Sequence, residues 1–468
     1  MLGDDRSESN RGGLEGESDL LLGEGGGTDK KNDATLSSTF SIASAEELAA
    51  EPAKRAGAFT VGLLIVADVV GSGILSLPST YATLGWVLSV LFSIIFAGIN
   101  ALSGMYVYEA YKMHPHALSF SDLAYHTFGK AGRIAVGIIT YVQIIFVLGA
   151  YMVSLAQTAA MVFYEYQICS VLWTLIAVVE LIPLMQMRTL ASLWFLLWLN
   201  LLFITVSVLI ALVSFTIEGQ AETLERVNGT TSVVANGITV YSFFGAMGSF
   251  AYAYVGCYIF VEILSEMKKH EEFPHALLGI ATPTTLTYYL VVGCWGYAYL
   301  GSGGSGMFIS DMPQGPAYIA AALFLHLHML ITFIVKGTIL TRFFHRKFHL
   351  ESINDEGYKG RLVYLGCSML TVVLCFVIAN LIPFFEDLVS LIGSLFIPFL
   401  GFLFPYMFVI KSRISHKKKT PVYEYIFFGV MTAFLICLLG FGTYSAISDI
   451  AAKWDSLGAP FSCNEGFE

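Results

Sequence analysis

The sequence predicts an all-α polytopic membrane protein with about eleven transmembrane helices. Of its 468 residues 56% are hydrophobic and only 13% are charged, whereas soluble proteins carry about 25% charged residues. Apolar runs of roughly 20 residues, each long enough to cross a bilayer as a helix, recur along the chain. The first of these runs also holds Gly71 and Gly73, on either side of a serine, followed by a proline. Because backbone groups need partners in hydrocarbon, such an interruption is expected only where it borders protein or a cavity.

The expected spans divide the chain into three parts. The tail over 1–54, rich in Gly, Ser, Asp and Glu, is expected to be disordered and cytosolic. The region 55–447 holds the spans, and 448–468 is expected to be a short extracytosolic tail. The spans are expected at 58–80, 84–112, 132–163, 168–187, 190–217, 238–265, 276–300, 315–344, 360–382, 385–411 and 422–447.

Lysine and arginine residues set the expected orientation. If the N-terminus is cytosolic, the outer flanks of the spans hold only Arg226 and Lys453, and the other basic flanking residues lie inside. The C-terminus then emerges outside. Asn228 begins an N-glycosylation sequon in an outer loop, which is either used or unused. Cys169 and Cys463 also lie near the outer face, so a disulfide between them is possible.

The first span contains Gly71, Ser72 and Gly73, followed by Pro78. This pattern predicts a helix that unwinds near mid-membrane depth, as in transporters whose broken helices hold the substrate. The competing interpretation is close helix packing through small residues. Packing alone does not require both glycines and a proline within one short stretch, so the broken helix is favoured.

A second interruption is expected in the sixth span at Gly256, at the corresponding place if spans one to five and six to ten are repeats. Freed amides at Gly71 to Gly73 would favour a carboxylate. Freed carbonyls on the opposite half-helix could hold an ammonium group. Tyr252 and Tyr254 would then line the side-chain pocket, although packing is the alternative role for both. This chemistry suits a zwitterion.

Three stretches resemble the amino acid/auxin permease family in residues, order and spacing. They are Gly71–Pro78, Phe250–Gly256 with the segment from Glu262 to Leu277, and Ile382–Ser394 with Phe404–Pro405. The resemblance covers residues 55–447. It implies a LeuT-like five-plus-five inverted repeat with broken helices one and six plus one extra helix. It also implies amino acid transport coupled to protons or sodium, and His326 resembles a histidine often seen in the eighth helix of that family. Asp68 departs from the small residue common at its place in that family.

Charged residues inside the membrane are costly and are functional candidates. In the implied fold, helices one and eight touch near a cation site with eighth-helix hydroxyls, of which Thr332 is one. We expect Asp68 and Lys336 to face each other there, with Lys336 replacing a sodium ion and Asp68 carrying the coupled proton. The alternative is a static buried pair. For His326 the alternatives are a proton relay and a packing hydrogen bond.

These observations predict a secondary active transporter of amino acids, coupled to protons rather than sodium, that works by alternating access around a midplane site. The alternatives are a transporter of another weak acid, such as an auxin-like solute, and an amino acid sensor on the same fold. No catalytic, metal-ligating or nucleic-acid-binding pattern is present, so we expect no enzyme activity, cofactor, metal or nucleic acid. We expect a monomer among membrane lipids, in the plasma membrane or a vacuolar or lysosomal membrane.

Overall fold

The computed structural model describes residues 57–166, 168–186, 193–353, 355, 357–457 and 460–463. All regular elements within these ranges are helices, as expected for an all-α membrane protein. The tail expected over 1–54 and the last residues of the C-terminal tail, 464–468, lie outside the described residues.

Among the described residues, eight helices are long and apolar enough to cross a membrane, or ten if each of two bent pairs counts as one span. The shorter apolar helix α7 (Ser170–Leu184) occupies the place of the expected fourth span. Six further helices lie in other expected positions. They are α5 (Trp86–Met113), α6 (Phe120–Val162), α8 (Leu193–Glu218), α12 (Thr282–Leu300), α13 (Pro316–Phe348) and α14 (Tyr358–Leu381).

Three further segments are interrupted. The first is made of α3 (Ala58–Val69), η1 (Ser72–Ser76) and α4 (Leu77–Leu84), and it bends by 52°. The sixth is made of α10 (Val240–Tyr254), η3 (Cys257–Ile259) and α11 (Phe260–Glu266). The tenth, α15 (Phe385–Leu395), the π-helix η9 (Pro398–Leu403) and α16 (Phe404–Ser415), bends by 43°. The first two interruptions are expected from the sequence, and the third is not.

The third helix begins earlier than the expected boundary of 132. The side chain of Ser119 caps α6 by accepting a hydrogen bond from the amide of Asp122, and Asp122 pairs with Arg133 across an interruption at Gly129. Because Gly129 has a φ of +70°, the chain turns there at little steric cost. The segment before the turn therefore forms a short helix that a hydropathy pattern overlooks.

The last helix also extends past the expected boundary of 447. After α17 (Val422–Cys437) and η10 (Leu438–Gly442), α18 continues over Thr443–Leu457. The side chains of Ala446 and Ile450 are buried, and the indole of Trp454 donates a hydrogen bond to the carbonyl of Leu381. The face of α18 that carries these residues packs against α15 and α10, and this packing stabilises the extension as a helix. Part of the expected C-terminal tail is thus helix.

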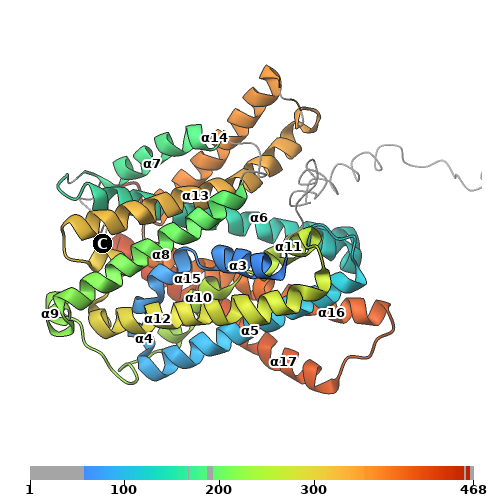
Figure 1. The fold of residues 1–468 in the computed structure, drawn as a ribbon, viewed down its shortest axis with the longest axis horizontal. Helices are drawn as coiled ribbons and strands as arrows, with labels where there is room; N and C mark the ends of the chain where they lie inside the picture. The colour runs from blue at the N-terminus through green and yellow to red at the C-terminus, as the bar shows by residue number, and fades with distance from the viewer. Residues whose placement is uncertain are drawn as a thin grey trace, which may run out of the picture.

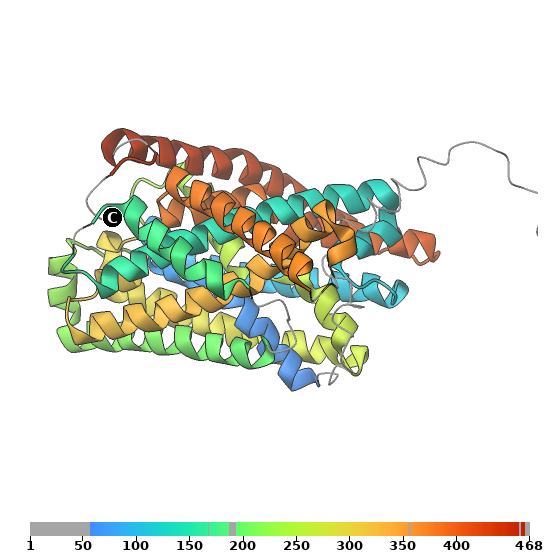
Figure 2. The ribbon, with the colours of Figure 1, turned by 90° about the horizontal axis from the view of Figure 1, so that it is seen from above.

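The helices run roughly along the long axis of the molecule (Figure 1). At one end lie the short helix α9 (Gln220–Arg226) and the disulfide between Cys169 and Cys463. We call this end the C-terminal face, and the end where α11 and α16 finish the opposite face. Seen from above, α18 and α8 lie along opposite edges of the bundle (Figure 2). The interrupted sixth span is central, because 83% of its most apolar 18-residue stretch is buried inside the protein.

Candidate functional site

The interruption of the first span exposes backbone donors. Between α3 and η1 the chain passes through Gly71, and within the described residues neither the Ser72 amide nor the Gly73 amide donates to an acceptor. Both amides stand at the start of a helical segment, where the peptide dipoles favour a negative charge. This is the arrangement expected from the glycine and proline pattern.

The interruption of the sixth span lies directly beside the first. The helix α10 ends at Tyr254, Val255 is extended, and the Gly256 amide donates to the Asn100 side-chain oxygen over 3.4 Å. An added methyl group at Gly256 would lie 2.6 Å from the Val69 side chain, which is closer than van der Waals contact allows. The break therefore lies at the residue where the sequence predicts it.

Gly73 and Gly71 serve different purposes. A methyl group on Gly73 would lie 2.7 Å from the Cα of Ala253, so the two interrupted helices are in direct backbone contact there. A methyl group on Gly71 would meet only the carbonyl of Asp68, at 3.8 Å. Close packing and an open backbone therefore occur within the same three residues, and the two interpretations of this stretch are both correct in part.

A cavity lies between the first, third, sixth and eighth spans. It holds about 330 Å³ of empty space, part of which is open to solvent. Backbone from the first break, the side chains of an ion pair and three tyrosines form much of its wall. The lining residues are Asp68, Val69, Gly71, Ser72, Gly73, Gln143, Val147, Tyr151, Tyr252, Val255, Tyr258 and Lys336.

Asp68 and Lys336 face each other in this cavity. The Lys336 Nζ lies 3.8 Å from the Asp68 Oδ1, and the two side chains are 15% and 20% exposed. The ammonium group also donates to the Tyr258 hydroxyl over 3.4 Å and lies 5.8 Å from the centre of the Tyr151 ring. Since a buried charge without a partner is costly, each residue depends on the other for its place in the membrane.

The two tyrosines of the sixth span point to different places. The Tyr252 hydroxyl lies 2.8 Å from the Ser72 Oγ and lines the cavity, as expected. The expectation for Tyr254 is wrong, because its ring packs edge-on against Tyr289 and lines a separate hollow beside Asn100. Residues two apart on an α-helix point to nearly opposite sides, so both cannot face one pocket.

Thr332 and His326, for which ion coupling is predicted, do not line this cavity. The Thr332 hydroxyl pairs with the side chain of Asn200 on α8 and with the carbonyl of His328. The His326 ring contacts the Thr158 hydroxyl at 2.9 Å and the Glu180 carboxylate at 3.0 Å. Thr332 therefore contacts α8, and His326 contacts α6 and α7.

Asn228 follows α9 at the C-terminal face. Its side chain is exposed, and its backbone φ of +51° places it in the left-handed region that asparagine tolerates. The sequon is therefore accessible on the same end of the molecule as the disulfide.

The structure adds Tyr289, which the sequence analysis missed. Its hydroxyl lies 2.7 Å from the Val69 carbonyl and 2.8 Å from the Ala253 carbonyl, and its side chain is fully buried. A single hydroxyl on α12 thus links the ends of the two interrupted helices. The chain has 24 tyrosines, and none of the sequence patterns distinguishes this one.

We expect Tyr289→Phe to lower the apparent melting temperature and to reduce transport about tenfold. Losing the hydroxyl leaves buried carbonyls short of a donor, at a cost of about 1–3 kcal/mol. The matched control is Tyr288→Phe, because the adjacent Tyr288 hydroxyl makes no hydrogen bond within the described residues. Thermal unfolding in detergent and uptake into proteoliposomes are the measurements. Equal effects of the two substitutions would contradict the linking role of Tyr289.

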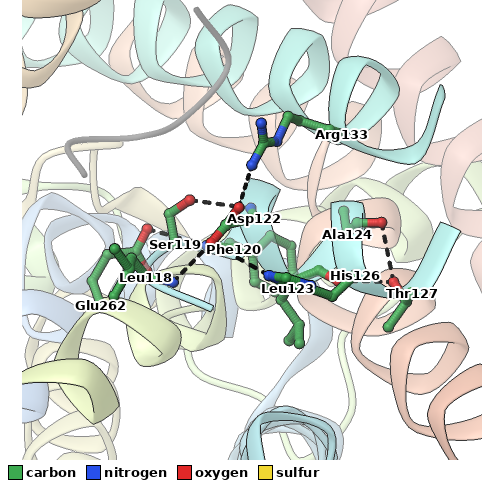
Figure 3. A network of polar contacts seen from close by, with 10 residues as sticks. All are labelled: Leu118, Ser119, Phe120, Asp122, Leu123, Ala124, His126, Thr127, Arg133 and Glu262. Atoms are coloured by element: carbon green, nitrogen blue, oxygen red, sulfur yellow. Dashed lines mark hydrogen bonds and ion pairs between the residues drawn. The ribbon is translucent and has the colours of Figure 1, made fainter. Parts of the chain in front are cut away.

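The two interrupted helices are each fastened to another helix at one face. At the C-terminal face, the Ser79 hydroxyl of α4 donates to the Glu386 carboxylate of α15 over 2.7 Å. At the opposite face, the Phe120 amide of α6 donates to the Glu262 carboxylate of α11 over 3.3 Å. Figure 3 shows the latter contact beside the Asp122 ion pair that shapes the start of α6. Each of these two contacts holds the half of an interrupted span that follows its break.

Comparisons with known proteins agree with this architecture. The family described as "Transmembrane amino acid transporter protein" matches residues 54–448. An N amino acid transport system protein of Neurospora crassa is 22% identical over 425 residues, which cover 87% of this chain and 88% of that protein. Amino acid transporter AVT1B of Arabidopsis thaliana is 25% identical over 393 residues, covering 82% and 69%. Both are named as transport proteins, in line with the expectation of a non-enzymatic function.

Two solved structures share the fold. The crystal structure of MhsT in complex with L-phenylalanine has a TM-score of 0.53 at 14% identity and covers 85% of this chain and 98% of that one. A Na⁺-coupled sialic acid symporter in a substrate-bound outward-open state has a TM-score of 0.50 at 14% identity, covering 94% and 98%. Both support the expected LeuT-like fold. The chain therefore belongs to the family of transmembrane amino acid transporters and is a multi-pass membrane protein.

Proposed function

We propose that this protein is a secondary active transporter that couples amino acid movement to protons by alternating access around the central cavity. The observation that supports it most directly is the ion pair beside the unpaired amides. Asp68 and Lys336 line the same cavity as Ser72 and Gly73. A binding surface for a zwitterion and a titratable carboxylate therefore share one small space.

In this proposal the amino acid binds through its charged ends. Its carboxylate accepts hydrogen bonds from the free amides of Ser72 and Gly73, where the start of η1 supplies a favourable dipole. Its ammonium group lies against backbone carbonyls at the end of α10. The Tyr252 hydroxyl, already 2.8 Å from the Ser72 Oγ, orders the side chain next to the bound carboxylate.

The coupled proton binds to Asp68. While Asp68 is ionised, it holds Lys336 and so joins α3 to α13. Protonation removes the negative charge, and the ammonium group of Lys336 keeps only its contacts with Tyr258 and Tyr151. The link between the first and eighth spans then weakens, and α3 is freer to move. Lys336 supplies the positive charge that a sodium ion would otherwise provide, so sodium is not required.

Alternating access would proceed by releasing one tie at a time. Breaking the contact between Ser79 and Glu386 would open the C-terminal face, and breaking that between Phe120 and Glu262 would open the opposite face. We place the N-terminus in the cytosol and the C-terminal face outside the cell or in an organelle lumen, since basic flanking residues concentrate at the other side. We further propose that the protein works as a monomer in the plasma membrane or a vacuolar or lysosomal membrane.

The test of this function is uptake of labelled amino acids into proteoliposomes, with and without a pH gradient and with and without sodium. We expect a pH gradient to drive accumulation by the wild-type protein in the absence of sodium. Asp68→Asn should abolish this accumulation, because a side-chain amide cannot bind and release a proton at physiological pH. Counterflow exchange of amino acids should continue in this variant.

The matched control is Glu222→Gln, which removes an exposed carboxylate on α9 at the C-terminal face. This variant should accumulate amino acids like the wild type. Proton-driven accumulation that survives unchanged in Asp68→Asn would refute the coupling role of Asp68. The absence of any amino acid counterflow in the wild type would refute the transport function itself.

A further inference from the structure

The third span contributes one side chain to the cavity whose chemistry bears on substrate choice. Gln143 lies on α6 and borders the cavity together with Val147 and Tyr151, which follow it at intervals of four residues on the same helix face. The cavity wall across from α6 includes Gly71 and Tyr252. Gln143 is only 2% exposed. Its carboxamide is therefore a built part of the cavity wall, not a surface group.

The carboxamide of Gln143 is not fully satisfied within the protein. Its Oε1 is shielded from solvent and has no hydrogen-bond partner among the described residues. Most buried polar groups in proteins do have a partner, so an exception beside a binding cavity needs an explanation. A ligand that brings a hydrogen-bond donor to this position would satisfy the group.

The neighbouring polar groups do not provide that donor. Lys336 is engaged by Asp68 and Tyr258, and Tyr252 is engaged by Ser72. The remaining side chains that line the cavity include only three that are purely aliphatic, all valines: Val69, Val147 and Val255. The cavity thus lacks an extended apolar surface for a large aliphatic side chain. Its positive and negative charges are already matched to each other, which disfavours a charged side chain.

We propose that Gln143 selects neutral amino acids whose side chains carry a hydrogen-bond donor, namely carboxamides and hydroxyls, over aliphatic ones of the same size. This inference rests on the proposed function, because it concerns the side-chain end of the same substrate. A carboxamide substrate such as glutamine complements Gln143 fully, since each amide can donate one hydrogen bond and accept one. A site with a buried polar group discriminates against analogues that leave it unpaired.

The experiment compares glutamine with methionine, which has nearly the same size and no donor in its side chain. Wild-type protein, Gln143→Met and Gln157→Met are reconstituted into proteoliposomes, and the ratio of glutamine to methionine uptake is measured. We expect Gln143→Met to reduce this ratio about tenfold, the effect of one lost hydrogen bond to a buried amide. Gln157 is the matched control, as it is also buried on α6 with an unpartnered Oε1 but does not line the cavity.

The outcomes separate the inference from the proposed function. A ratio that stays the same in Gln143→Met, or falls equally in Gln157→Met, overturns the selectivity role while amino acid transport stands. A wild-type protein that takes up no amino acid in counterflow overturns both. If Gln143→Met does not fold, the melting temperature of the wild-type protein is measured with glutamine and with methionine at equal concentration. A larger increase with glutamine supports the proposed selectivity. An equal or smaller increase overturns it.

Discussion

Lys336→Met is expected to destabilise the protein strongly and to abolish transport. Removing the ammonium group leaves the Asp68 carboxylate, 20% exposed, without the cation 3.8 Å away. Breaking one side of a buried ion pair costs about 3 kcal/mol or more. We expect the apparent melting temperature in detergent to fall by about 5 °C, and proteoliposome uptake to fall to background.

The double variant Asp68→Asn with Lys336→Met distinguishes a coupling pair from a static one. Removing both charges leaves no unpaired ion, so stability should return to near that of the wild type. If the pair carries the coupled proton, transport driven by a pH gradient stays absent in this stable protein. A double variant that regains proton-driven uptake would show that the pair is only structural.

Gly73→Ala is expected to reduce transport by more than tenfold. The added methyl group would lie 2.7 Å from the Cα of Ala253 and 3.2 Å from the Tyr252 ring. Because the nearest atom belongs to the backbone, relief requires the two interrupted helices to separate, and overpacking of this kind costs roughly 1–3 kcal/mol. The separation would also displace the amide of residue 73 from its place in the cavity wall.

The control for this substitution is Gly98→Ala on α5. Gly98 lies on an exposed helix face and would place its methyl group in open space, so transport and stability should stay close to the wild type or improve slightly. Uptake and thermal unfolding are measured for both variants. If Gly73→Ala transports as well as Gly98→Ala, the close contact between the two breaks is not needed for function.

Local chemistry made the central features predictable from sequence. Gly71, Gly73 and Gly256 weaken a helix wherever they occur, and the interruptions lie at these residues. The contact between Asp68 and Lys336 was predictable because charges within a membrane span require partners. The third interruption also has a local cause in the sequence, because Pro398 lies within an apolar run and begins the π-helix where the tenth span bends.

Features set by distant contacts were not predictable in the same way. Tyr289 links two helices through their carbonyls, and no periodicity reveals which of many tyrosines reaches both. The helical turn alone predicts that Tyr254 points away from Tyr252. Aromatic residues are so abundant in this chain that the pattern did not show which of the two faces the cavity. The extension of α18 was missed because its buried face, including Ile450, alternates with charged residues that lower its hydropathy.

The disulfide between Cys169 and Cys463 has a bearing on how the molecule is assembled. The two cysteines are 294 residues apart, and Cys463 lies beyond the final helix. The bond can therefore form only after every intervening segment has been synthesised and α18 has delivered the chain end to α7. Once closed, it joins the segments from α7 to α18 into one covalent ring, with α3 to α6 outside it. The oxidation state of these sulfurs therefore reports whether the later helices have been inserted and brought together.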